Sequence, residues 1–166
     1  MTFPLRLLAH DLRVPENVGS LFRISDALGV ERLHLTGRTP IPPHAKIRRL
    51  ARATEKTVSW RYDGDPGPVL KELGTAGYTL AAVETGADSR DVRSLAEADY
   101  DRIAIVVGAE REGLPPDVLE RCSMRLRVPM FGLNTSMNVA QAAAIALWEA
   151  GRRFYPFAEL PSATDP

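Results

Sequence analysis

The sequence has little cysteine, no long hydrophobic run and no excess of charge of one sign. Its one cysteine, Cys122, cannot form an internal disulfide, and a lone thiol is typical of a reducing compartment. The apolar N-terminal stretch is interrupted by Arg6 and ends at Asp11, too early for a signal-peptide core or a membrane span. We therefore expect a cytoplasmic protein with no membrane segment.

Charge is balanced, with 21 Lys and Arg against 21 Asp and Glu. A weak overall field gives no support for non-specific nucleic-acid binding, so any such binding must come from a local patch. The three histidines lack the spacing of metal ligands, and no histidine lies near Cys122 in the sequence. We expect neither a metal site nor thiol catalysis.

The 166 residues, 45% of them hydrophobic, suit one domain. We expect it to span residues 1–155, with the proline-containing segment 156–166 as a flexible tail. Periodicity and capping residues predict strands alternating with helices. Strands are expected at 5–9, 31–36, 57–60, 78–83, 102–107 and 125–128, and helices at 18–28, 45–52, 68–76, 115–121 and 136–149. This alternation predicts an α/β domain with a mostly parallel sheet flanked by helices.

Three loops that follow predicted strands carry polar residues, and such loops form the ligand sites of open α/β sheets. In the first, Asn17 is predicted to cap the helix 18–28, and Arg23 follows six residues later. Both side chains could project toward one pocket. The alternative, favoured by this segment alone, is a capping asparagine and a surface arginine.

The second loop runs from Gly108 to Gly113 and contains Glu110 and Glu112. The glycines permit close approach of a ligand, while the carboxylates would repel a pyrophosphate and favour a neutral or cationic ligand. A solvated turn is an equal alternative. A third possibility is a nucleotide-binding protein that uses this loop for phosphate, although the loop comes late in the chain.

The third loop, 128–138, brings small and polar residues to the start of the last helix, and some of them must cap it. Its methionines, Met130 and Met137, read alone, are typical core residues. The small residues of the AAAIAL segment that follows permit close helix packing, with a dimer partner as one possibility.

Together the three segments resemble the motifs of the SpoU/TrmH family of RNA 2′-O-methyltransferases, within the SPOUT superfamily. The first motif corresponds to Asn17, Gly19 and Arg23. The second corresponds to VVGAEREGL with the turn Val128-Pro129-Met130, and the third to Ser136-Met137-Asn138-Val139. The resemblance covers residues 5 to 150. One departure is Ala140, where the family commonly has serine, and we expect it to remove one cofactor or capping hydrogen bond.

The resemblance implies a C-terminal trefoil knot, S-adenosylmethionine as cofactor, and a minimal, standalone homodimer in which the partner chain completes each site. It places the cofactor against Gly108, Val128, Ser136 and Met137, with Ala82 as a weaker candidate. It also implies a catalytic group made of Arg23, Asn17, Glu110 and Asn138. The substrate would be tRNA or rRNA.

A basic segment separates the second predicted strand from the next. We predict that Lys46, Arg48, Arg49 and Arg52 contact the RNA backbone, because phosphate neutralisation dominates nucleic-acid affinity. A solvated helix face is an equally supported alternative for such a charge run. At the level of the whole protein, the alternative is a catalytically silent, knotted RNA-binding or assembly factor.

Overall fold

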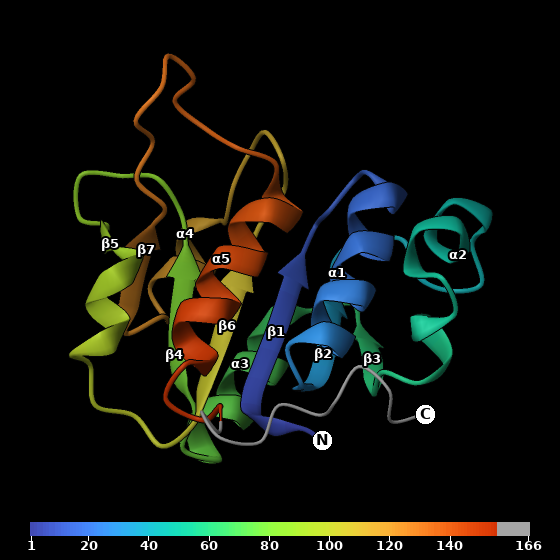
Figure 1. Ribbon diagram of the computed structural model, residues 1–166, viewed down its shortest axis with the longest axis horizontal. Helices are drawn as coiled ribbons and strands as arrows, with labels where there is room; N and C mark the ends of the chain where they lie inside the picture. Colours follow the sequence, from blue (N-terminus) through green and yellow to red (C-terminus); the bar gives the residue numbers. More distant parts are fainter. Residues whose placement is uncertain (156–166) are drawn as a thin grey trace.

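The computed structural model describes residues 1–155, in which a seven-stranded sheet lies between two layers of helices (Figure 1). The tail predicted at 156–166 lies outside the described residues. All strand pairs are parallel, in the order β3-β2-β1-β6-β4-β7-β5. The strands are β1 Phe3–His10, β2 Val30–Thr36, β3 Trp60–Asp63, β4 Thr79–Val83, β5 Arg90–Asp91, β6 Ile103–Val107 and β7 Met124–Arg127.

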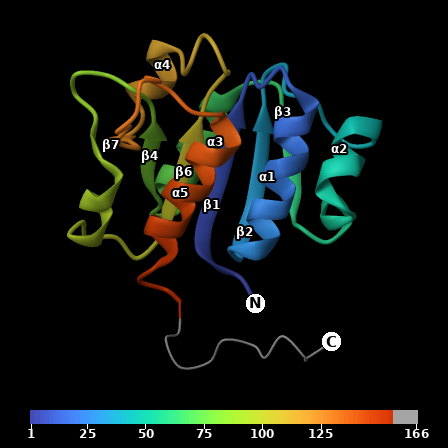
Figure 2. The same ribbon diagram turned by 45° about the horizontal axis from the view of Figure 1, so that its top comes forward.

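Helices cover both faces of the sheet. They are α1 Pro15–Ala27, α2 Ala45–Ala51, α3 Pro66–Thr75, α4 Pro116–Leu119 and α5 Val139–Gly151, with short 3-10 helices η1 Thr54–Lys56 and η2 Val92–Ala96. Helices α1 and α5 lie side by side on one face, while α3 and α4 pack on the other (Figure 2). None of the helices among residues 1–155 is long and apolar enough to cross a membrane.

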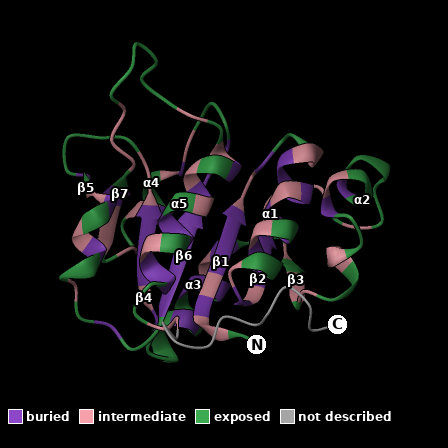
Figure 3. Cartoon of the chain, viewed as in Figure 1, coloured by how far each residue is buried: buried purple, intermediate pink, exposed green. Residues whose placement is uncertain are grey.

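The core is divided by the sheet, because successive strand residues point to opposite faces. Leu7 and Ile105 pack with α1 and α5, whereas Leu8 and Val106 pack with α3 and α4. Every residue of β6 is buried (Figure 3), as predicted for a strand covered on both faces. The predicted α/β architecture with a parallel sheet is confirmed; the knot stays a prediction.

Local differences from the expected elements have physical causes. Helix α1 begins at Pro15, with Val14 as its N-cap and no capping side chain. The prediction that Asn17 caps this helix is therefore wrong: proline suits the first helical turn, and Asn17 lies within the helix with its amide directed elsewhere. The strand predicted at 57–60 lies later in the chain, because residues Thr54–Lys56 form a 3-10 helix and β3 begins only at Trp60.

The chain changes direction across the sheet between its neighbouring strands β1 and β6. From β1 it continues through β2 to β3 on one side, while β4, β7 and β5 lie on the other. Ligands of open α/β sheets bind at such a switch point, beyond the carboxyl ends of the strands. The loops that follow β1, β4, β6 and β7 meet at this edge.

Candidate active site

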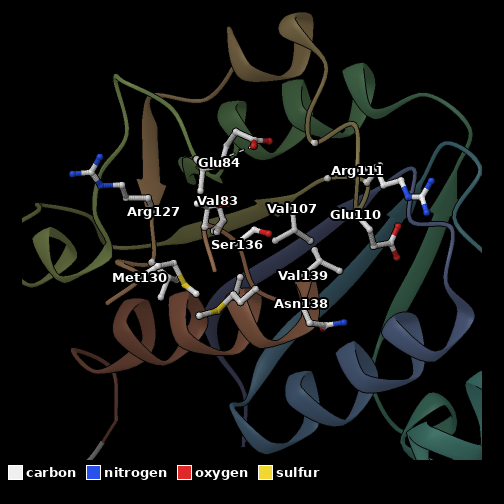
Figure 4. Close-up of a pocket in the computed structure, with 18 residues that line it drawn as sticks. Val83, Glu84, Val107, Glu110, Arg111, Arg127, Met130, Ser136, Asn138 and Val139 are labelled. Carbon is white, nitrogen blue, oxygen red and sulfur yellow. Dashed lines mark hydrogen bonds between the residues drawn. The ribbon is translucent and has the colours of Figure 1, made fainter. Parts of the chain in front are cut away.

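A cavity of about 350 Å³ opens at the carboxyl ends of β4, β6 and β7 (Figure 4). Its size falls within the range of small-molecule sites, roughly 300–1,000 Å³. Predicted residues from the second and third loops line it: Gly108, Glu110, Val128, Ser136, Met137 and Asn138. The structure therefore brings together two of the three predicted segments in one chain.

The first segment joins this cavity through a chain of side-chain hydrogen bonds. The Asn17 amide donates to Glu110 Oε1 at 2.7 Å, and Asn138 donates to Asn17 Oδ1 at 2.9 Å. Asn17 is buried, while its partners Glu110 and Asn138 are exposed, so both hydrogen bonds are partly buried. Three residues far apart in the sequence are thereby held in one geometry.

Glu110 is held by the backbone as well as by Asn17. Its carboxylate accepts from the N–H groups of Arg13 at 3.0 Å and Val14 at 3.2 Å, in the loop before α1. Partial burial, the largest single influence, raises the pKa of Glu110, but the donors of Arg13, Asn17 and Val14 together outweigh it and leave the pKa below its usual value. Glu110 is therefore an ionised anchor at neutral pH.

Asn138 connects the cavity to the last helix. Its Oδ1 accepts from the backbone N–H groups of Ala140 at 2.9 Å and Gln141 at 3.4 Å, which makes Asn138 the N-cap of α5. The cap is present although Ala140 itself carries no hydroxyl. Any substitution of Asn138 therefore alters both the site and the start of the helix.

Glu84, which follows β4, is a cavity residue that the sequence analysis missed. Its carboxylate accepts from the backbone N–H of Leu114 at 2.9 Å and so fixes the loop after β6. The left-handed Gly113 lies against this carboxylate, and a side chain there would collide with it. The available signal was a carboxylate directly after a buried strand that neighbours β6.

Ala82, the weaker cofactor candidate, does not line the cavity. It is fully buried and packs among the side chains between the sheet and helices α3 and α4. The cavity begins one residue later, at Val83, and includes Glu84 and Thr85. The correction follows from strand alternation, which directs Ala82 into the core.

Arg23 is exposed on α1 and is absent from the residues that line the cavity of its own chain. Six residues along a helix correspond to about 240° of rotation about its axis, so Asn17 and Arg23 face different directions. The expected convergence of the amide and the guanidinium therefore does not occur within residues 1–155 of a single chain.

The predicted basic residues all lie on or next to α2, and all four are exposed. Lys46 and Arg49 pair with Glu16 of α1, at 3.1 and 3.8 Å. These exposed pairs connect α2 to the helix that carries Asn17. Arg48 and Arg52 have no salt bridge within the part of the chain that the structure describes.

Burial raises the pKa of Cys122 to about 11, so its thiol is protonated at neutral pH. Across residues 1–155, no group of three or more His, Cys, Asp or Glu side chains is placed to hold a metal ion.

Relatives of known description match most of the chain. A tRNA (guanosine(18)-2′-O)-methyltransferase of Thermus thermophilus is 31% identical over 150 residues, which cover 90% of this chain and 75% of the relative. The AdoMet-bound rRNA methyltransferase of Sinorhizobium meliloti superposes with a TM-score of 0.84 at 25% identity, over 92% of this chain and 57% of that one.

A third match is similar in size to this chain. A structure solved to explain the 2-OH methylation of C/U34 on tRNA has a TM-score of 0.77 at 30% identity, covering 90% of this chain and 95% of that one. The sequence profile of the SpoU rRNA Methylase family matches residues 4–148. The match includes all three motif segments and confirms the resemblance seen in the sequence: the chain belongs to the SpoU rRNA methylase family.

Proposed function

We propose that the protein transfers a methyl group from S-adenosylmethionine to a ribose 2′-hydroxyl of tRNA or rRNA. The observation that carries the proposal is the Glu110–Asn17–Asn138 chain, which attaches the first family motif to the cavity formed by the other two. The tRNA 2′-O-methyltransferase and the AdoMet-bound rRNA methyltransferase among the relatives support both the reaction and the cofactor.

The cavity suits a cofactor with apolar, polar and cationic parts. Val107, Val128 and Met130 supply apolar surface, and the carboxylates of Glu84 and Glu110 favour a positive charge. The guanidinium groups of Arg111 and Arg127 point outward on opposite sides, and the Glu110 carboxylate lies on the same side as Arg111 (Figure 4). When bound, S-adenosylmethionine supplies an electrophilic methyl group.

Positioning is the main task of the chain's own residues. Asn17 and Asn138 orient the nucleotide against the cavity, and the ionised Glu110 fixes Asn17. Arg23 stabilises the developing alkoxide and the adjacent phosphate, because a guanidinium stays protonated in proteins and is unsuited to act as a base. The hydroxyl proton passes to a phosphate oxygen or to water.

The active unit in this proposal is a homodimer. Arg23 lies away from the cavity of its own chain, so the Arg23 that serves each cavity comes from a partner chain. Large apolar side chains are exposed at Phe131 and Leu133 of the loop before α5 and at Ile145 and Trp148 of α5 itself. Such surfaces mark association sites.

RNA approaches over the basic helix α2, where Lys46, Arg48, Arg49 and Arg52 neutralise phosphates. The proposed compartment is the cytoplasm, where these RNAs occur. Reversing two charges at once, Arg48→Glu with Arg49→Glu, should weaken RNA binding and reduce its salt dependence.

The reaction is tested with the Arg23→Ala variant. Methyl transfer to total RNA should fall by at least about 10²-fold, while cofactor affinity stays unchanged, because Arg23 does not line the cofactor cavity. Radiolabelled S-adenosylmethionine measures transfer and calorimetry measures binding. Arg90→Ala, at the exposed β5 edge, is the matched control and should retain wild-type transfer.

Two outcomes would contradict this assignment. Wild-type turnover by Arg23→Ala would exclude the proposed role of Arg23 in methyl transfer. If the unaltered protein binds RNA but transfers no methyl group to any RNA, the catalytically silent RNA-binding protein becomes the better description.

The partner's contribution is tested with hybrid dimers. Arg23→Ala protomers lack the arginine, and Ser136→Trp protomers have a blocked cavity. Mixing the two inactive variants under subunit exchange should restore transfer, because hybrid dimers contain one site with an intact cavity and an intact Arg23. No recovery in a sample that contains hybrid dimers would show that the arginine acts within its own chain.

A further inference from the structure

A second cavity, of about 620 Å³, is lined by residues of α2, η1 and β3. Helix α2 and strand β3 lie at the end of the sheet opposite β7 and β5 (Figure 1). This second cavity is separate from the cofactor cavity and shares no lining residue with it. Its walls are formed by the Pro42–Pro43 segment, by α2 and η1, and by Trp60 at the start of β3.

The charges in this cavity lack ion-pair partners among residues 1–155. Glu55 places its Oε2 atom out of contact with solvent, and no described residue donates a hydrogen bond to it. Arg48 and Lys56 line the same cavity, and neither forms a salt bridge with any of residues 1–155. Their neighbours Lys46 and Arg49 instead share Glu16 as an ion-pair partner. Arg48 and Lys56 thus line one cavity together with Glu55, whose Oε2 atom is a buried acceptor without a partner among the described residues.

Trp60 lines the cavity with an aromatic ring that is held in place by its contact with Phe22. Its ring meets Phe22 edge to face, with centroids 5.9 Å apart and an interplanar angle of 89°. The Trp60 side chain is only half-buried, so part of it remains available to the cavity that it lines. A ring held in this way can stack with a planar ligand at little cost in side-chain entropy.

An unusual backbone turn delivers Glu55 and Lys56 to the cavity. Arg52 and Ala53 both have left-handed conformations, with φ of 51° and 74°, which residues with side chains seldom adopt. Helix α2 ends there and η1 begins immediately afterwards. Strained backbone of this kind is concentrated at ligand sites.

We propose that this cavity binds one nucleotide of the RNA substrate, remote from the methylated ribose. A base with an exocyclic amino group stacks on Trp60 and donates to Glu55, and its phosphate lies between Arg48 and Lys56. Guanine fits best, since it presents two adjacent donors to a carboxylate, whereas uracil has no amino group. The assignment to substrate RNA rests on the proposed methyltransferase function.

The position of the cavity suits this role. Glu16 of α1 contacts Lys46 and Arg49 of α2, so the cavity lies one helix away from the segment that carries Asn17 and Arg23. An RNA strand crossing α2 would reach both places. Binding here would select which RNA enters the active site without taking part in methyl transfer.

Nucleotide binding is tested by fluorescence in a Trp148→Phe background, which leaves Trp60 as the one tryptophan. Titration with GMP should quench the emission of Trp60, and UMP should bind at least about fivefold more weakly. Glu55→Gln should weaken GMP binding by about tenfold, and Lys56→Ala should weaken all nucleotides alike. Lys71→Ala, on the exposed surface of α3, is the matched control and should bind as the parent does.

Three results would overturn the proposal: no quenching by GMP, equal GMP affinity in Glu55→Gln, or equal affinity for inorganic phosphate and GMP. Equal affinity for phosphate would reduce the cavity to an anion site. These titrations need no methylation, so they separate a failure of the cavity from a failure of the proposed function.

Kinetics then distinguish a nucleotide of the substrate from a free nucleotide. With substrate RNA, Lys56→Ala should raise KM about fivefold or more and leave kcat and cofactor affinity unchanged, whereas Lys71→Ala should change neither. If GMP binds but KM for RNA does not change, the site serves a free nucleotide, and its assignment to the RNA is wrong.

Discussion

At the scale of single residues, Asn17 has partners that are 93 and 121 positions away along the chain. One side chain uses its donor for Glu110 and its acceptor for Asn138, so neither neighbour can move without affecting the other. The Asn17 amide can both donate and accept a hydrogen bond, and a side chain that can only donate or only accept would not replace it.

Replacing Asn17 by aspartate tests this requirement. Asn17→Asp puts a second carboxylate within hydrogen-bond distance of Glu110 and removes the donor, so we expect about 1–3 kcal/mol less stability and at least about 10²-fold lower kcat. Chemical denaturation and a methylation assay give the two values.

The same replacement at an exposed position provides the control. Asn134→Asp, in the exposed loop before α5, should retain the denaturation midpoint of the parent protein. An Asn17→Asp variant as stable and active as the parent would show that the hydrogen-bonded chain is incidental.

The residues of the Glu110–Asn17–Asn138 hydrogen-bond series could be identified from the sequence, but the hydrogen bonds between them could not. Motif resemblance singled out Asn17, Glu110 and Asn138, yet local spacing alone favoured a capping role for Asn17. Its hydrogen-bond partners are Glu110, in the loop after β6, and Asn138, directly before α5. Only the assembled sheet brings these two loops near Asn17. Glu84 was missed for the same reason, because its contact with Leu114 spans 30 positions.

At the scale of elements, Gly19 sets the distance between α1 and α2. A Cβ at this position would lie 2.7 Å from the Ile47 carbonyl oxygen and 2.9 Å from the Leu50 Cβ. Both contacts are closer than real Cβ atoms tolerate, and one is with backbone. The glycine of the first motif thus sets how closely the basic helix α2 packs against α1.

A pair of glycine substitutions separates packing from helix propensity. Gly19→Ala should destabilise the fold by about 1–3 kcal/mol and weaken RNA binding, because α2 must move. Gly74→Ala, also in a helix but with nothing within 4 Å of its Cβ, should stabilise by up to about 1 kcal/mol. Thermal unfolding measures both, and an equal gain at both positions would refute the close contact.

Strong local patterns were enough to predict most elements. The apolar run of β6 and the small-residue helix α5 follow from their residues, and their ends differ from the predicted ones by at most three positions. The two-residue strand β5 and the 3-10 helix η2 carry no periodicity, so nothing in the sequence indicated them. Tertiary contacts decide such short segments.

At the scale of the whole molecule, stability should depend on acid through one buried histidine. His34 is almost fully buried in β2, and neither ring nitrogen has a hydrogen-bond partner among the described residues. Burial, aided by the nearby Arg61 and Arg6, lowers its pKa from 6.5 to about 4. The folded protein therefore favours the neutral ring, while the unfolded chain protonates near pH 6.5.

The sign of the effect follows from this difference. The contribution of His34 is fully present above pH 6.5 and is lost as the pH falls toward 4, by about 3 kcal/mol in total. Asp11 affects stability only at a lower pH, because hydrogen bonds from Arg38 reduce its pKa to about 2. Urea unfolding of the parent and of His34→Leu at pH 7.5 and 4.5 should show a smaller pH-dependent loss in the variant; identical losses would exclude His34 as the cause.

The position of the 128–138 loop and α5 late in the chain affects how the protein folds during its synthesis. Ser136, Met137 and Asn138 belong to the connection that leads into α5, the last helix, which packs against α1 at the other side of the switch point. During synthesis, a chain that has reached β7 has all the strands found in residues 1–155 but lacks the Asn17–Asn138 link. Because domains fold as units and such distant contacts form late, a nascent chain on the ribosome should be silent toward RNA until its final helix has docked.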